Sequence, residues 1–149
     1  MKILISCDYS ASGEHVLYEA NKFLSAFPTA DIHVFSVIDI SVVSAGGMYN
    51  NTELLSSLEL DAKELCKKAE FIFSGRQINF STEVGYPAET VLQMATKLPA
   101  DLLVLGTHGR TGLDRIVIGS VAESILRRAP CNTLVIPVKH KDREQTSAK

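Results

Sequence analysis

The segment from Gly106 to Gly119 contains the residues whose types and spacing best suit chemistry. It follows a short apolar run, 102–105, that predicts a buried strand. It precedes Ser120 and Glu123, whose spacing of three predicts a capping box at the start of a helix. Glycine-rich backbone leading into a helix N-terminus, with arginines nearby, suits the binding of a phosphate group. The segment is therefore expected to be a phosphate-binding loop.

The spacing within this loop differs from that of the familiar nucleotide-binding loops. Its glycines and arginines are Gly106, Gly109, Arg110, Gly112, Arg115 and Gly119. A P-loop places Lys and then Ser or Thr directly after its last glycine. Here the candidates for that glycine are Gly112 and Gly119, and Lys follows neither of them. A Rossmann fingerprint belongs on the first strand-to-helix turn, where residues 7–10 contain no glycine. A surface loop with glycines for flexibility is the alternative, but αβ connections usually run to about two to six residues.

Apolar periodicity divides the rest of the chain into alternating strands and helices. Apolar or β-branched runs predict five strands, at 2–7, 32–38, 78–84, 102–105 and 133–138. Apolar residues at three- and four-residue steps predict helices at about 16–27, 54–72, 87–98 and 120–128. Residues 39–51 are expected to form a mobile loop. This alternation predicts an α/β fold, in which a parallel sheet has helices on both faces.

The strand order decides where a ligand would bind. For a five-stranded parallel sheet of this kind we expect the order 3-2-1-4-5, which reverses between the first and fourth strands. Ligands of such sheets bind at the carboxyl ends of the strands at this reversal. Asp8 ends the first strand and Gly106 ends the fourth. Two signals that are far apart in the sequence are therefore expected to meet at one crevice.

Composition sets the broad class. The length of 149 residues indicates one domain, residues 1–140, followed by a charged tail, 141–149, that is expected to be flexible. The net charge of −2 gives no basic surface for nucleic acid. No apolar run has the length of a secretion signal or a membrane span, and the three cysteines form no CxxC pair. We expect a soluble, cytoplasmic protein that binds neither nucleic acid nor membrane.

The long glycine pattern resembles that of a known family. Gly-x-x-Gly, nine residues and then Gly-Ser is similar to the ATP-binding motif of universal stress proteins, which have a Rossmann-like fold of the adenine nucleotide alpha hydrolase type. The resemblance extends over nearly the whole chain, through Asp8, residues 37–39, Gly85-x-Pro87, residues 100–110 and the closing residues 134–138. The family has nucleotide-binding and non-binding branches, and the complete motif implies the ATP-binding branch.

The resemblance implies a role for each matching position. Asp8 and the backbone of Val37 would hold the adenosine end of ATP. The ribose and phosphates would contact Gly106, His108, Gly109, Gly119, Ser120 and Val121. The chemistry is compatible with these roles, because a carboxylate accepts hydrogen bonds from ribose hydroxyls and glycines let the main chain approach phosphate.

The two arginines of the loop are a less specific signal for phosphate binding than its glycines. Arg110 and Arg115 could each contact a phosphate or simply face solvent. The four histidines are scattered through the chain, so no protein metal site is expected, and any Mg²⁺ would be carried mainly by the phosphates.

These observations predict an ATP-binding protein of stress response or signalling in which nucleotide sets the conformation of the loop. No activated nucleophile or carboxylate pair stands out, so no catalytic residue is assigned and at most slow ATP hydrolysis is expected. The alternative is a nucleotide-independent interaction module of the same fold. The family implies a symmetric homodimer in either case, paired through the exposed edge strand from Thr133 to Val138. A two-component receiver is set aside, because no acidic residue ends the third strand.

Overall fold

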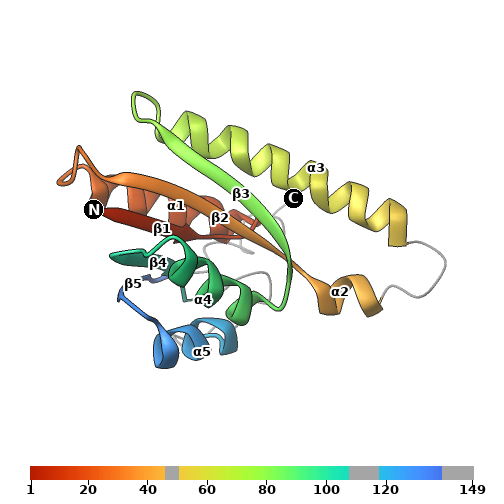
Figure 1. The fold of residues 1–149 in the computed structure, drawn as a ribbon. Helices are drawn as coiled ribbons and strands as arrows, with labels where there is room; N and C mark the ends of the chain where they lie inside the picture. Colours follow the sequence, from red (N-terminus) through yellow and green to blue (C-terminus); the bar gives the residue numbers. More distant parts are fainter. Residues whose placement is uncertain (46–50, 108–117, 139–149) are drawn as a thin grey trace, which may run out of the picture.

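The computed structural model describes residues 1–45, 51–107 and 118–138. They form a central sheet between two layers of helices (Figure 1). In chain order the elements are β1 (Lys2–Ser6), α1 (Ala11–Leu24), β2 (Asp31–Asp39), α2 (Ile40–Ala45), α3 (Asn51–Ile72), β3 (Ile78–Gly85), α4 (Pro87–Lys97), β4 (Leu102–Gly106), α5 (Ser120–Arg128) and β5 (Asn132–Ile136).

The sheet has the predicted topology. Its order is β3-β2-β1-β4-β5, and all four strand pairs are parallel. The order reverses between β1 and β4, where Ser6 pairs with Leu105. Asp8 lies two residues after Ser6, and Gly106 lies one residue after Leu105, so the structure brings the two sequence signals to the same edge of the sheet.

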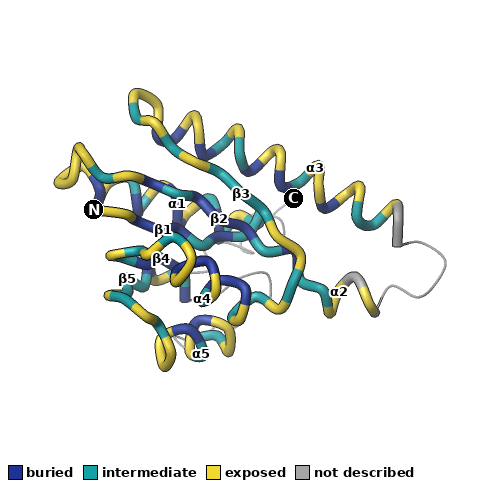
Figure 2. The backbone as a smooth tube through the Cα atoms, viewed as in Figure 1, coloured by how far each residue is buried: buried dark blue, intermediate teal, exposed yellow. Residues whose placement is uncertain are grey.

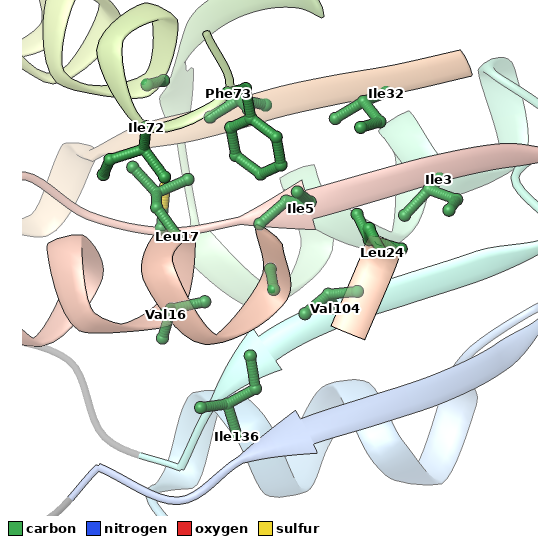
Figure 3. Packing of buried hydrophobic residues seen from close by; sticks show 14 of the residues in the cluster. Ile3, Ile5, Val16, Leu17, Leu24, Ile32, Ile72, Phe73, Val104 and Ile136 are labelled. Atoms are coloured by element: carbon green, nitrogen blue, oxygen red, sulfur yellow. The ribbon is translucent and has the colours of Figure 1, made fainter. Parts of the chain in front are cut away.

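Two apolar cores hold the layers together. Ile3 and Ile5 of β1 face α1 and α3 and belong to the core drawn in Figure 3. Leu4, between them in sequence, faces the opposite way and packs with Leu103 of β4 against α4 and α5. Alternate residues of a central strand are thus buried on both sides, which explains its uninterrupted apolar sequence. Figure 2 shows that burial falls off toward β3, which lies at one edge of the sheet.

The expected loop at 39–51 is wrong over much of its length. Helix α2 begins directly after β2, and α3 already begins at Asn51. Asp39 starts α2, because its Oδ1 accepts hydrogen bonds from the backbone N–H of Ser41 at 2.9 Å and from the Ser41 hydroxyl at 2.7 Å. A helix of six residues is too short to produce a detectable apolar period. Gly46, Gly47 and Asn50, which suggested the loop, lie outside the described residues.

The expected capping box at α5 is also wrong. The N-cap is Gly119 rather than Ser120, and it makes no side-chain cap. The Glu123 carboxylate accepts a hydrogen bond from Arg127 at 2.8 Å, one turn further along the helix. The helix begins one residue earlier than the box requires, so the Ser120 hydroxyl lies within the first turn instead of capping it.

The last strand is displaced from its predicted range of 133–138. It runs from Asn132 to Ile136, so Pro137 and Val138 lie beyond it. Pro137 has no backbone N–H to donate to a ladder. The backbone N–H of Val138 instead donates to the Thr107 hydroxyl at 3.0 Å.

Candidate functional site

A cavity of about 420 Å³ opens where the strand order reverses. Residues following β1 and β4 line it together with parts of β2, α1, α2, α4 and α5. Its volume lies within the range of about 300–1,000 Å³ typical of small-molecule sites. Six of the predicted site residues line this one cavity, namely Asp8, Val37, Gly106, Gly119, Ser120 and Val121. The other four, His108, Gly109, Arg110 and Arg115, lie outside the described residues.

Apolar side chains form much of the remaining lining. Val16 comes from α1, Leu105 from β4, Val91 from α4 and Ile125 from α5, so both helix layers contribute. These side chains are nearly buried by their neighbours, which fixes their positions. An apolar lining with a few convergent polar groups is typical of a small-molecule site.

Asp8 presents its carboxylate at the end of β1 with one oxygen already engaged. Its Oδ1 accepts hydrogen bonds from the backbone N–H of Ser10 at 3.1 Å and from the Ser10 hydroxyl. The Ser10 hydroxyl in turn accepts a hydrogen bond from the backbone N–H of Gly13 at 3.3 Å and so caps α1. Within the described parts of the chain, no hydrogen bond to Asp8 Oδ2 is found, so this oxygen is the acceptor that Asp8 can offer to a ligand.

The backbone of Val37 faces the cavity because β2 is longer than β1. The ladder between these strands ends at the pair Ser6–Phe35, and the last bond runs from the Cys7 N–H to the Phe35 carbonyl at 3.1 Å. Backbone groups of alternate residues point to the same side of a strand. The N–H and C=O of Val37 therefore point the same way as those of Phe35, past the end of β1 and toward the cavity that Val37 lines.

Thr107 joins the two ends of the glycine loop. Its carbonyl accepts a hydrogen bond from the Gly119 N–H at 2.8 Å, and its own N–H donates to the Ile136 carbonyl at 3.0 Å. The Gly119 amide is thus occupied within the protein. The amides of the next three residues, Ser120, Val121 and Ala122, belong to the first turn of α5, whose N–H groups have no partner within a helix. These are the donors that the helix can offer to an anion.

Sequence reasoning missed three residues that shape the site. Thr107 gave no signal, since a lone threonine after a strand has no distinctive pattern. Ser10 and Gly13 did give a signal. The pattern Ser-x-x-Gly after the first strand places a serine N-cap three residues before a glycine, from whose N–H the serine can accept a hydrogen bond. Gly13 is required by close packing, since a Cβ there would lie 1.8 Å from the Asp8 carbonyl oxygen.

The titratable side chains of Cys7 and His33 are accounted for by burial and by contacts within the fold. Burial, and secondarily the charge of Asp8, raises the pKa of the Cys7 thiol, which keeps it protonated. His33 hydrogen-bonds the Ser81 hydroxyl at 2.7 Å, away from the cavity, and burial lowers its pKa.

Within residues 1–45, 51–107 and 118–138, no three His, Cys, Asp or Glu side chains are grouped to hold a metal ion. In those same residues, no helix is long and apolar enough to cross a membrane.

This fold and cavity define a Rossmann-like α/β domain with its candidate site at the point where the strand order reverses. The model of the universal stress protein family matches residues 1–137. The chain belongs to that family, as the resemblance of its glycine loop implied.

Individual relatives agree with this assignment. Universal stress protein MJ0531 of Methanocaldococcus jannaschii is 32% identical over 148 residues, covering 95% of this chain and 84% of the relative. Universal stress protein A homolog 1 of Coxiella burnetii is 35% identical over 144 residues, covering 92% and 96%.

Solved structures show the same fold. Protein MJ0577 of Methanocaldococcus jannaschii superimposes with a TM-score of 0.82 at 26% identity, covering 93% of this chain and 96% of that protein. A universal stress protein crystallised in complex with cAMP has a TM-score of 0.66 at 20% identity, covering 92% and 96%.

Proposed function

We propose that the protein binds ATP in the cavity at the carboxyl edge of the sheet and acts as a nucleotide-dependent switch in stress response or signalling. One observation carries this proposal. A single cavity joins a carboxylate after β1, a strand backbone on β2 and a helix N-terminus after the glycine loop. These are the three kinds of group that a ribose, a base and a phosphate chain require.

Each part of the nucleotide has a matching group. The ribose hydroxyls donate to Asp8 Oδ2, and the edge of the adenine pairs with the N–H and C=O of Val37. The phosphates lie at the start of α5, against the amides of Ser120 and Val121 and the Ser120 hydroxyl. The helix dipole stabilises an anion there by about 0.3–1 kcal/mol. Any Mg²⁺ is held mainly by the phosphates, as the sequence predicted.

Rapid hydrolysis is not part of the proposal. Among the described residues, the carboxylates that line the cavity are Asp8 and Asp39, and each uses Oδ1 to hold a local turn. Cys7, also in the lining, is a buried thiol with a raised pKa, so it is a poor nucleophile. We therefore propose no catalytic residue and at most slow turnover of bound ATP.

The three cysteines are free, which supports a cytoplasmic location.

The test begins with the protein as purified. It has no Trp and four Tyr, so its own absorbance at 280 nm is weak and bound adenine should be evident at 260 nm. Acid extraction and chromatography should release an adenine nucleotide. Calorimetry on the stripped protein should then give one ATP per chain, with GTP as the base control and cAMP as a competitor. A purified protein without nucleotide that also gives no heat with ATP would rule out the proposal and leave the nucleotide-independent module.

We also propose that the chain forms a homodimer through β5. This strand pairs only with β4 within the described sheet, so its outer edge is open. The Ile136 carbonyl bonds Thr107, on the β4 side, so by alternation the backbone groups of Thr133 and Val135 point outward. An outward-facing edge of this kind pairs readily with a second copy.

Replacing Val135 with proline should give monomers in sedimentation. Proline removes an outward N–H while leaving the hydrogen bonds to β4 in place, and it is tolerated on edge strands. A charge at Ile136 would be a poor test, because that side chain is only 6% exposed and belongs to the core. Thr133→Val is the matched control, since it keeps every backbone donor and should stay dimeric. A Val135→Pro variant that remains dimeric would place the interface elsewhere.

A further inference from the structure

We propose that Ser10 is a positioning residue, which fixes the Asp8 carboxylate so that only Oδ2 is presented to the cavity. The site then requires a ribose hydroxyl for tight binding. This inference rests on the proposed function, because it concerns the same nucleotide site. Ser10 is not among the residues that line the cavity, so its effect on a ligand must pass through Asp8.

The Ser10 hydroxyl has both of its roles assigned. It donates its only proton to Asp8 Oδ1 and accepts the Gly13 N–H at 3.3 Å. The Ser10 backbone N–H is a second donor to the same carboxylate oxygen, at 3.1 Å. Two donors from one residue thus hold Oδ1, and the hydroxyl is itself held by the first turn of α1.

Gly13 closes the other side of this arrangement. A Cβ at position 13 would lie 1.8 Å from the Asp8 carbonyl oxygen and 2.8 Å from Oδ1. The carboxylate therefore occupies space that exists only because residue 13 has no side chain. Held by Ser10 and packed against Gly13, the carboxylate cannot exchange its two oxygens without breaking both hydrogen bonds.

This arrangement makes the two carboxylate oxygens chemically different. Oδ1 is used by the protein, and Oδ2 is left as a fixed acceptor whose natural donor is a ligand hydroxyl. In an Asp8→Asn variant, the amide oxygen would stay at Ser10, because both groups there are donors. The amide nitrogen would then take the position of Oδ2, so the acceptor facing the ligand would become a donor while the turn kept its shape.

The experiment compares ATP with 2′,3′-dideoxy-ATP by calorimetry. The wild-type protein should prefer ATP by about 10-fold, and Asp8→Asn should reduce this preference, because a charge-assisted bond is replaced by at most a weaker neutral one. Ser10→Ala and Ser10→Gly should weaken ATP by roughly 3- to 10-fold and leave the dideoxy nucleotide within about 2-fold, since one hydrogen bond is affected. Ser10→Thr, which restores a hydroxyl, should recover the preference.

Two variants separate positioning from stability of α1. Ser10→Gly retains most of the N-cap propensity that Ser10→Ala loses, so a folded protein is available to test. Asn21→Ala removes the bond from the Asn21 amide to the Ile72 carbonyl, at 2.8 Å, without touching Asp8. It should leave the ratio of the two affinities unchanged.

The outcomes distinguish this inference from the proposed function. If Ser10→Gly weakens both nucleotides equally, or leaves ATP binding unchanged, the positioning role is overturned while ATP binding stands. If the wild-type protein binds neither nucleotide, the proposed function fails and the positioning role fails with it.

Discussion

Replacing Gly119 with valine should lower the affinity for ATP by about 100-fold while the protein stays folded. Gly119 lines the cavity and has φ −64° and ψ 156°, an extended conformation that valine adopts without strain. The added side chain would therefore act by filling space beside the amides of Ser120 and Val121. Losing one charge-assisted hydrogen bond costs about 1.5–3 kcal/mol. The expected decrease of about 100-fold in affinity therefore corresponds to the loss of about one of the two bonds to these amides.

The measurement is a calorimetric titration beside a thermal unfolding curve. Gly119→Ala should lie between wild type and Gly119→Val, because its side chain is smaller. Leu126→Val is the control, since it places a valine within α5 itself, at an exposed position outside the cavity lining. Unchanged ATP affinity in Gly119→Val would mean that the phosphates do not approach the start of α5.

Replacing Gly13 with alanine should destabilise the protein by about 2 kcal/mol, measured by denaturant unfolding. Alanine favours a helix over glycine by about 1 kcal/mol, so propensity alone predicts the opposite sign. The clash decides the outcome, because a Cβ would lie 1.8 Å from a backbone oxygen that cannot rotate away. Helix α1 and the turn at Asp8 must separate, which breaks the bonds to Ser10.

Ser12→Ala is the control for the Gly13 variant. It lies in the same first turn of α1 and introduces the same methyl side chain without the close approach to Asp8. It should be neutral or slightly stabilising. Removing the Asp8 side chain should not rescue Gly13→Ala, because the closest clash is with the main chain. A Gly13→Ala protein as stable as wild type would contradict the close packing of this turn.

The sheet could be predicted because its central strands are buried on both faces. Residues such as Ile3, Leu4 and Ile5 are apolar without interruption, and this pattern, alternating with helical periods, leaves few possible topologies. Once the order was fixed, the meeting of Asp8 and Gly106 followed from geometry. The glycine pattern and the motifs along the chain resembled those of the family, and the family model matches residues 1–137.

Details set by tertiary geometry could not be predicted. The N-cap of α5, Gly119, is tied by its N–H to the Thr107 carbonyl, and no local pattern encodes that pairing. The direction of the Val37 backbone depends on where β1 ends relative to β2. Helix α2 was missed because its cap, Asp39, was interpreted as the start of a loop. In each case a partner distant in the sequence, or a very short element, decides the local structure.

The bond between Thr107 and Gly119 has a consequence for how this protein can diverge. It closes the glycine loop near its two ends, so the end of β4 and the start of α5 are tied to each other directly. Doubling the length of a closed loop costs only about 0.6 kcal/mol of conformational entropy. Insertions and substitutions between these two residues can therefore accumulate at little expense to folding.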